Sequence, residues 1–497
     1  MNLDVAFLHP PAILSKPPLL KRLRFRRPPP PTQYLIMPMG LFSISALLED
    51  NGFKVRLFNL GLEAILGSRP KELIKHLEAD IYAIDLHWFV HADGALKVAE
   101  LCKKLHQNSL VVLGGLTATY FDLEILKKYP FVDVIIRGEG EESFLELVKQ
   151  YFKKNDLSRV KGIKGLTIRI NNKVVRTPPR PPVKDLDRLD FTRLDLLEHW
   201  YQYLRVSISD YIPHKVPAYW LTIGRGCPHT CIYCSGSAKS YPALAGRCSS
   251  KFRSPDKVIE DLIKLQEYGV KIIRFGQDIE LAGSKYYNKV FHNIKSEGLD
   301  LALYNECWNH LPSSYFIRKA KSAFYACNIV ISPDSASENV RWKAMRLMVS
   351  NKHLLKNITM LDQNEIVTDV YFLIGLPGET WETLKEMKKL AIKIAKTNWA
   401  WVAAPFPFTL EPGSPMFDEP EKYGIRLFCR TLEDYRKAFL SPDPKDWICH
   451  ETENMTRSDI AKATHMLGRF ISSLNQPGLY KKQEFEFGKI ISRQLTL

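Results

Sequence analysis

Three cysteines at C-x3-C-x2-C spacing place the strictest constraint on the fold of this 497-residue chain. Cys227, Cys231 and Cys234 follow an apolar run that ends at Ile223. A tight loop with this spacing can aim three thiolates at one point, and soft thiolates select iron–sulfur clusters or zinc over hard cations. Three thiolates can hold three corners of a four-iron cluster and leave its fourth iron open. No nearby fourth Cys or His completes a closed zinc site, although His229 lies within the loop. The alternatives are a zinc knuckle or three unrelated buried cysteines.

The loop resembles that of the radical S-adenosylmethionine (SAM) superfamily, in which an aromatic residue precedes the third cysteine, as Tyr233 does here. The resemblance implies that Cys227, Cys231 and Cys234 hold a [4Fe–4S] cluster whose open iron chelates SAM. It also implies that an electron donor such as ferredoxin or flavodoxin reduces the cluster. Cleavage of SAM would then produce a 5′-deoxyadenosyl radical.

The composition is that of a globular chain with several domains. Hydrophobic residues make up 45% and charged residues 25% of the sequence, which are ordinary globular values, and the length predicts two or three domains. No apolar run reaches the ~18 residues of a membrane span, and no basic flank marks a signal peptide. Nine cysteines in a long chain favour a reducing compartment over a disulfide framework. We therefore expect a cytoplasmic protein, with peripheral attachment to a membrane left open.

The formal net charge of +16 is mostly dispersed along the chain. The exception is the basic run Lys21–Arg27, which Pro28–Pro31 follow, and which we expect to form an exposed loop of polyproline character. Such a loop could contact phosphate groups, including lipid headgroups. No RNA-binding motif accompanies it, so nucleic acid is not an expected partner.

Residues 1–150 alternate short apolar runs with helical patterns, which predicts an α/β domain with a doubly wound parallel sheet. The predicted strands are 3–8, 55–59, 81–86, 110–113 and 132–136, and the predicted helices are 41–50, 70–78, 93–107, 122–128 and 142–151. Ligands of such sheets bind beyond the carboxyl ends of the strands. The candidate cofactor-binding residues at those ends are His9, Pro10, His87, Trp88, Gly114, Gly115, Thr117, Gly138, Glu139 and Gly140.

This region resembles the cobalamin-binding domain that precedes many radical SAM cores. The resemblance rests on Val112–Gly115 with Thr119 after it, on Val132–Glu141, and on Pro38–Leu41. It implies a cobalamin cofactor held by the candidate residues. Domains that ligate cobalt through the protein carry an Asp-x-His-x-x-Gly loop after the first strand, where this chain has His9-Pro10-Pro11. We therefore expect no histidine of that motif on the cobalt, and we expect His87 to be a wall residue.

Residues 151–215 are predicted to link two domains. A β-hairpin is expected at 163–170 and 173–176, and the proline-rich stretch Pro178–Pro182 ends it. Acidic and apolar residues alternate in Asp185–Leu197, and we expect this segment to lie on the next domain.

Residues 216–425 contain six strand–helix units, which by the same resemblance form a partial (β/α)6 barrel. The predicted strands are 218–223, 272–275, 299–304, 328–332, 367–373 and 399–405, and the predicted helices are 255–268, 285–296, 313–321, 337–349 and 379–397. Reactive groups of α/β barrels gather at the C-terminal strand ends. The resemblance implies that SAM is held there by Tyr233, Gln277, Asp278, Glu306, Ser332, Asp334, Gly375 and Leu376. Of these, Gly375 and Leu376 belong to a stretch similar to the adenine-binding motif of the family, whereas Gln277 and Asp278 match the SAM amino-group motif only in part.

Residues 426–497 are predicted to form a mostly helical extension, with helices at 431–439 and 457–474. The extension could close the barrel mouth over the substrate or pack against the barrel. The sequence leaves both roles open.

Together the two resemblances imply a cobalamin-dependent radical SAM enzyme. The leading hypothesis is a methyltransferase that acts on an unactivated carbon through a 5′-deoxyadenosyl radical and methylcobalamin. The alternative is a cyclase or an enzyme that forms or rearranges carbon–carbon bonds in a lipid or small metabolite. A methylthiotransferase is disfavoured because such relatives carry three cysteines in the N-terminal domain, where this chain has only Cys102. A sensing module without catalysis is disfavoured by the intact cysteine loop. The substrate (protein, lipid, peptide or metabolite) stays open.

Overall fold

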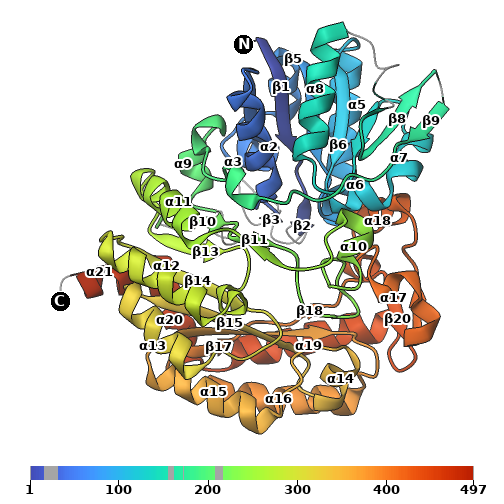
Figure 1. Ribbon diagram of the computed structural model, residues 1–497. Coiled ribbons are helices and arrows are strands. Elements are labelled where there is room, and N and C mark those ends of the chain that lie inside the picture. The colour runs from blue at the N-terminus through green and yellow to red at the C-terminus, as the bar shows by residue number, and fades with distance from the viewer. Residues whose placement is uncertain are drawn as a thin grey trace. The chain divides into compact units, whose positions relative to one another are not determined.

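The computed structural model describes residues 2–15, 32–154, 160, 162–171, 173–206 and 216–495. The basic run Lys21–Arg27 and the prolines after it lie outside the described residues. The chain divides into two compact units, each made of three segments (Figure 1). Unit 1 comprises Met1–Pro213, Tyr241–Cys248 and Cys429–Asp443, and unit 2 comprises His214–Ser240, Ser249–Phe428 and Pro444–Leu497.

Unit 1 is built on a seven-stranded sheet with the strand order β4-β1-β5-β6-β7-β8-β9. The five parallel strands are β1 (Asn2–His9), β4 (Val55–Asn59), β5 (Glu78–Asp85), β6 (Leu110–Gly114) and β7 (Val134–Ile136). An antiparallel hairpin, β8 (Leu166–Ile170) and β9 (Lys173–Arg176), extends the sheet at one edge. The middle strands are buried on both faces, which explains why they read as continuous apolar runs.

Helices cover this sheet in two layers. They are α2 (Met39–Asp50), α3 (Leu60–Ile65), α4 (Pro70–His76), α5 (Ala92–Leu105), α6 (Leu116–Tyr120), α7 (Asp122–Lys128) and α8 (Glu141–Lys154). Helix α2 packs against α8, and α4 packs against α5. This arrangement confirms the predicted doubly wound domain.

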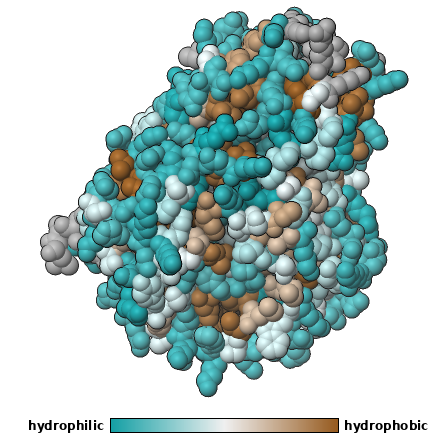
Figure 2. Space-filling model, in the orientation of Figure 1, coloured by the Kyte–Doolittle hydropathy of each residue, from teal (hydrophilic) through white to brown (hydrophobic). Residues whose placement is uncertain are grey.

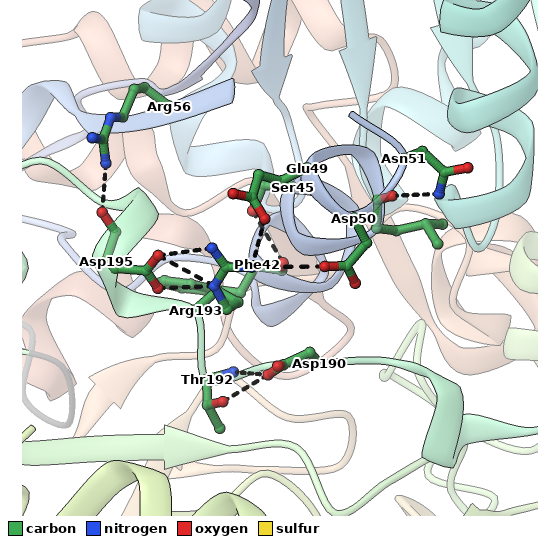
Figure 3. A network of polar contacts seen from close by, with 11 residues as sticks. Phe42, Ser45, Glu49, Asp50, Asn51, Arg56, Asp190, Thr192, Arg193 and Asp195 are labelled. Carbon is green, nitrogen blue, oxygen red and sulfur yellow. Dashed lines mark hydrogen bonds and ion pairs between the residues drawn. The ribbon is translucent and has the colours of Figure 1, made fainter. Parts of the chain in front are cut away.

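The linker segment 185–197 packs on unit 1, so its predicted place on the next domain is wrong. Arg193 binds Glu49 of α2 at 2.7 Å and Asp195 at 2.8 Å (Figure 3). The backbone nitrogen of Glu198 donates to the carbonyl oxygen of Leu57 in β4 at 2.9 Å. Alternating apolar residues show that a segment packs on a core, but they do not say which core.

Unit 2 is an open parallel sheet with the order β10-β13-β14-β15-β16-β17, and β18 also pairs with β16. Its strands are β10 (Ala218–Leu221), β13 (Ile272–Phe275), β14 (Ala302–Cys307), β15 (Cys327–Asp334), β16 (Val367–Ile374), β17 (Ala400–Val402) and β18 (Phe406–Pro407). Its outer helices are α11 (Pro255–Glu267), α12 (Ser284–Ser296), α13 (Ser314–Ala323), α14 (Glu338–Lys343), α15 (Asn351–Gln363) and α16 (Trp381–Ala395). Figure 1 shows these helices along the outside of the strands, which confirms the partial barrel.

Two predicted barrel elements are displaced. Strand β14 begins three residues later than the predicted strand 299–304, so Glu306 lies within the strand and not after it. The predicted helix 337–349 is wrong in its second half, because α14 ends at Lys343. A new helix, α15, begins after Ser350, whose side chain accepts a hydrogen bond from the backbone nitrogen of His353.

The C-terminal residues are divided between the two units. Helix α18 (Leu432–Leu440) belongs to unit 1, where Arg436 binds Asp93 at 3.0 Å and Tyr435 packs on Phe89. The remaining helices, α19 (Arg457–Ser473), α20 (Pro477–Glu486) and α21 (Lys489–Leu495), belong to unit 2.

Helix α20 packs against the barrel near the N-terminal ends of the strands. Its buried Lys482 binds Asp369 of β16 and Asn328 of β15, both at 2.8 Å. This end is opposite the C-terminal strand ends, so α20 packs against the barrel and does not close its mouth.

The surface is mixed in character. Figure 2 shows a mostly hydrophilic face with apolar side chains in scattered groups. Across the described ranges, no helix is both long enough and apolar enough to cross a membrane.

Candidate functional site

The cysteine loop leaves the C-terminal end of β10, and two short strands close its base. β11 (Gly224–Arg225) and β12 (Lys251–Phe252) pair antiparallel on either side of the excursion. Within the loop, the backbone nitrogen of Ala238 donates to the carbonyl oxygen of His229 at 2.8 Å. The nitrogen and the hydroxyl of Ser235 both donate to the Glu411 carboxylate, at 2.7 and 2.8 Å. These bonds fix the path of the chain through the three cysteines.

The three cysteine thiols are neighbours and are free of disulfides. Cys231 is buried, and Cys227 and Cys234 are half-buried. Burial raises the pKa of all three thiols, and the Glu411 carboxylate, followed by the other two cysteines, raises the pKa of Cys234 further. The three thiols therefore lie in one loop with a buried, negatively charged surrounding.

The donor set suits a cluster better than a single ion. Among the described residues, no group of three His, Cys, Asp or Glu side chains converges enough to hold one metal ion. A zinc site needs that convergence. A four-iron cluster binds each thiolate through a separate iron, so its protein ligands need not share one ion.

A buried ion pair lies beside Cys231. The Nε of Arg346 is 2.9 Å from an Asp334 carboxylate oxygen, and the Tyr233 hydroxyl donates to the same oxygen. Burial raises the pKa of the Cys231 thiol, and the positive charge of Arg346 opposes that shift. The Tyr233 ring also packs edge-on against Phe408 at 5.2 Å. Tyr233 and Asp334, both predicted from sequence, therefore meet at Arg346, which the sequence did not single out.

Asn309 holds the backbone around Arg346 in an unusual conformation. Met345 and Leu347 have φ values of 56° and 35°, which non-glycine residues seldom adopt without support. The Asn309 side chain donates to the Met345 carbonyl oxygen at 3.1 Å and accepts from the Leu347 nitrogen. Arg346 also donates to the carbonyl oxygen of Ser332 at 3.1 Å. No local pattern in the sequence signals this arrangement.

After β13, the side chains of the predicted residues Gln277 and Asp278 form hydrogen bonds within the protein. The side-chain oxygen of Gln277 accepts from the Gly224 nitrogen at 3.0 Å. Buried Asp278 accepts from the Trp308 nitrogen at 2.7 Å and bonds to His310 at 2.5 Å. Burial lowers the pKa of His310, but the Asp278 carboxylate outweighs this effect and raises the pKa to about 9. Asp278 thus holds a charged His310 near the cysteine loop.

Glu306 faces a cation inside the barrel. Its carboxylate is 2.7 Å from Arg274, whose guanidinium lies 3.9 Å from the centre of the Trp220 ring. The predicted reach of Glu306 toward a ligand therefore competes with this ion pair.

The turn after β16 is held from within. Gly375 has a φ of 99°, and its nitrogen donates to the Glu379 carboxylate at 2.6 Å. Its carbonyl oxygen is 2.9 Å from the His450 ring. Burial raises the pKa of Glu379 to about 8. Leu376 is buried beside the turn. The sequence had no signal for His450, which comes from β20 (His450–Thr452).

In unit 1, the loops after β5, β6 and β7 interlock at the carboxyl edge of the sheet. Gly115 has a φ of 109°, and a Cβ atom there would lie 2.6 Å from the Cα atom of His87, so only glycine fits. Thr117 donates to the His87 carbonyl oxygen at 2.9 Å. The Gly138 nitrogen donates to the Thr119 hydroxyl at 3.0 Å. Gly114 ends β6 at this edge.

The histidines at this edge differ in exposure. His9 is fully buried and bonds to Asp85 at 2.8 Å, and Pro10 is buried next to it. His87 and Trp88 are half-buried and pack against each other. Burial lowers the pKa of His87 to about 4, so its ring is neutral at neutral pH. The Nε2 of His9 lacks a hydrogen-bond partner within the described part of the chain. A buried nitrogen without a partner beside a glycine-lined edge fits a bulky polar ligand that inserts between the loops.

A buried ion pair fixes the loop after β7. Arg247, from the segment Tyr241–Cys248, contacts both carboxylate oxygens of Glu139 at 2.6 and 2.8 Å. Glu139 also accepts from the Val183 nitrogen at 3.0 Å. The same segment lies over Gly138, whose Cβ position would be 3.5 Å from the Leu244 carbonyl oxygen. Gly140 and Glu139, both predicted as cofactor residues, sit in this braced loop.

Two protein-family models match the chain. A B12 binding domain matches residues 32–148, and the radical SAM superfamily matches residues 221–391. The first implies cobalamin, and the second implies SAM and a [4Fe–4S] cluster. Of the predicted site residues, His9 and Pro10 lie outside the two matched ranges, and all the others lie within them.

Several characterised and uncharacterised proteins resemble the chain. An uncharacterized methyltransferase of Pyrococcus horikoshii is 28% identical over 92% of this chain and 92% of its own length. An anaerobic magnesium-protoporphyrin IX monomethyl ester cyclase of Cereibacter sphaeroides is 29% identical over 70% of this chain, and a hopanoid C-3 methylase of Methylococcus capsulatus is 22% identical over 54%. The chain spans 54% of that cyclase and 47% of that methylase.

A solved structure shares the fold. The radical SAM methyltransferase TsrM from Kitasatospora setae, with cobalamin and a [4Fe–4S] cluster bound, superposes with a TM-score of 0.65. The match covers 96% of this chain and 90% of TsrM at 15% identity.

Proposed function

We propose that this chain, which belongs to the radical SAM enzymes that carry an N-terminal B12-binding domain, transfers a methyl group to an unactivated carbon of its substrate. One observation carries the proposal: three free, neighbouring thiols at a barrel strand end occur in the same chain as a B12-binding domain. The similarity to an uncharacterized methyltransferase over 92% of both chains supports methyl transfer.

The two cofactor sites divide the chemistry. When bound, SAM at the reduced cluster supplies a 5′-deoxyadenosyl radical, and methylcobalamin supplies the methyl group. A radical is needed because acid–base groups do not remove hydrogen from an unactivated carbon. The protein's task is to bind these groups, orient them and exclude water.

Cys227, Cys231 and Cys234 would hold the cluster. Their raised pKa values mean that the thiols bind protons at neutral pH, so loading the cluster releases protons. Arg346 balances part of the negative charge that then collects at Cys231. Asp334 and Tyr233 hold the guanidinium in place.

SAM would lie along the same strand ends. We propose Gln277, Glu306, Ser332 and the turn at Gly375–Leu376 as its nearest contacts, although Gln277 also bonds to the Gly224 nitrogen and Glu306 also pairs with Arg274. Asp278 would not contact SAM directly, because it is buried and its carboxylate bonds to both the Trp308 nitrogen and His310.

Cobalamin would lie at the carboxyl edge of the unit 1 sheet. We propose that His87, Trp88, Thr117 and the glycines at 114, 115, 138 and 140 contact it, and that His9 and Pro10 form the wall beneath. Glu139 positions its loop through Arg247. No histidine of a cobalt-ligating motif binds the metal in this proposal.

A second candidate is ring closure or carbon–carbon bond formation. It is supported by the 29% identity to the anaerobic cyclase over 70% of this chain. The two candidates differ in their products. Methyl transfer yields 5′-deoxyadenosine and S-adenosylhomocysteine together, whereas the alternative yields 5′-deoxyadenosine without stoichiometric S-adenosylhomocysteine.

The test is product analysis under anaerobic conditions. The reconstituted protein is given SAM, methylcobalamin, a reductant and candidate lipid, peptide and metabolite substrates, and both SAM products are quantified. Substrate-dependent formation of both in equal amounts supports methyl transfer. Substrate-dependent 5′-deoxyadenosine alone would sink the methyltransferase proposal and favour the second candidate.

We further propose that the protein works in a reducing cytoplasm. Among the described residues, seven cysteines are free thiols, which supports this proposal, whereas Cys429 and Cys449 are disulfide-bonded, which taken alone favours an oxidising compartment. Peripheral membrane contact through the basic run Lys21–Arg27 is a separate proposal, and vesicle co-sedimentation of the full chain tests it.

A further inference from the structure

One segment of unit 2 contacts the predicted cluster ligand Cys231 and its neighbour Ile232. Residues 342–352, here the bridging segment, run from the end of α14 to the start of α15. The carbonyl oxygen of Ala344 accepts from the Ile232 nitrogen at 3.4 Å. The carbonyl oxygen of Met345 is 3.6 Å from the Cys231 sulfur. The inner side of the bridging segment therefore touches the predicted cluster ligand directly.

Side-chain hydrogen bonds hold the bridging segment where it is neither helix nor strand, between α14 and α15. The buried Arg341 guanidinium donates to the Val349 carbonyl oxygen at 2.7 Å and to the Asn351 side chain at 2.9 Å. The Asn309 side chain also bonds to the backbone of Met345 and Leu347, the two residues with positive φ values. Backbone strain of this kind persists only where the surroundings hold it, and it concentrates at functional sites.

The exposed side chains of the bridging segment, here called its outer face, are mostly apolar or basic. Trp342 is 49% exposed and Met348 is 57% exposed, and both residue types are enriched at protein interfaces. Exposed Lys343 and Lys352 lie in the same segment. Neither lysine forms an ion pair with a described residue, so their charges are available to a partner.

We propose that this outer face docks an acidic protein that donates one electron at a time, of the flavodoxin or ferredoxin class. The inference rests on the proposed function, because it requires a cluster at Cys231. The donor loses one electron and the oxidised cluster gains it, with no atom or proton transferred. Charge complementarity favours an acidic partner. The direct contact of the inner side with Cys231 favours an electron donor over other acidic proteins, because an electron entering here crosses only the bridging segment.

The test compares two reductants on the same cluster-loaded protein. Absorbance of the cluster is followed in a stopped-flow instrument after anaerobic mixing with reduced flavodoxin or with dithionite. The variants are W342A, M348A and K352E. Matched controls are Y325A, an exposed aromatic just before β15 at the opposite strand end, and K295E, an exposed lysine on α12.

With flavodoxin we expect K352E to slow reduction about tenfold at low ionic strength, with the deficit shrinking as salt is added. W342A should slow it about fivefold at every salt concentration, since its contribution is apolar contact. M348A should show a smaller loss of the same kind. Dithionite should reduce all variants at the wild-type rate, and the two controls should match wild type with both reductants.

Three results would overturn the inference. They are wild-type rates with flavodoxin in all three variants, equal slowing with dithionite, and a wild-type protein that dithionite reduces but flavodoxin does not. A wild-type protein that holds no cluster would instead refute the proposed function, so the two failures are distinguishable.

Discussion

The Glu139–Arg247 ion pair offers a quantitative test of what holds the loop after β7 in unit 1, where we propose that cobalamin binds. The pair is bidentate, at 2.6 and 2.8 Å, and its side chains are only 7% (Arg247) and 4% (Glu139) exposed. Arg247→Met removes the cation and leaves the carboxylate in a buried site. Removing one partner of a buried pair costs about 3–5 kcal/mol. The Val183 nitrogen still donates to Glu139, so we expect the lower end, about 3 kcal/mol.

Two readouts separate local from global effects. Urea unfolding measures the loss of stability, and titration with hydroxocobalamin, followed by its absorbance, measures the state of the loop. We expect R247M to weaken cobalamin binding about tenfold, which corresponds to ~1.4 kcal/mol. R247K keeps the charge but loses the bidentate geometry, so it should fall between R247M and wild type.

The matched control is a surface pair in the same unit. Arg188 lies 3.9 Å from Glu142 and its side chain is 67% exposed. Because exposed pairs contribute little, R188M should cost less than about 1 kcal/mol and leave cobalamin binding unchanged. The double variant R247M/E139Q should recover part of the loss, since no buried carboxylate remains without its cation. If R247M behaves like R188M in both readouts, the reasoning about this loop is refuted.

Three further predictions follow from buried groups elsewhere. K482M should lower the free energy of unfolding by about 3–5 kcal/mol because Asp369 loses its buried partner. The neighbouring K481M should lower it by less than about 1 kcal/mol, because Lys481 forms a more exposed pair. Equal losses in thermal or urea unfolding would contradict the conclusion that Lys482 anchors α20 to the barrel. Burial raises the pKa of Glu379 from 4.5 to about 8. The folded protein therefore binds this proton more tightly than the unfolded chain does, and the resulting stabilisation is full below pH 4.5 and is lost as the pH rises to 8. The loss is at most about 1.4 kcal/mol per pH unit. E379Q should flatten the stability–pH curve in that window. An unchanged slope would show that the pH dependence does not come from the titration of Glu379. Finally, the EPR spectrum of protein-bound cob(II)alamin should lack nitrogen hyperfine splitting, and splitting that disappears in H87A would identify a histidine ligand that we do not expect.

Much of the fold could be predicted because parallel strands that are buried on both faces appear in the sequence as continuous apolar runs. β5 and β6 are apolar runs bounded by helical patterns, and their observed limits differ from the predicted ones by only a few residues. The cysteine loop could also be identified from the sequence, because its chemistry depends on the spacing of three cysteines within nine residues. Ser254 precedes Pro255 as the N-cap of α11, and its side chain accepts a hydrogen bond from the Lys257 nitrogen.

The parts that could not be predicted depend on partners far away in the sequence. Arg346 lies near Cys231 between two residues with positive φ values, and Asn309, which is distant in the sequence, bonds to both of them. The apolar spacing after α14 continues like a helix, so the break at Ala344 left no local sign. Likewise, only the folded barrel shows that Lys482 of α20 binds Asp369 of β16.

The central claim is that Cys227, Cys231 and Cys234 hold a cluster that cleaves SAM. The most direct measurement is anaerobic reconstitution of the full chain with iron and sulfide, followed by quantification of 5′-deoxyadenosine after addition of SAM and dithionite. We predict that wild type shows the broad visible absorbance of a [4Fe–4S] cluster and forms 5′-deoxyadenosine. We predict that C227A, C231A and C234A form none, whereas C102A, which changes a buried cysteine of unit 1, retains it. Unchanged SAM cleavage in any of the three loop variants would contradict the account.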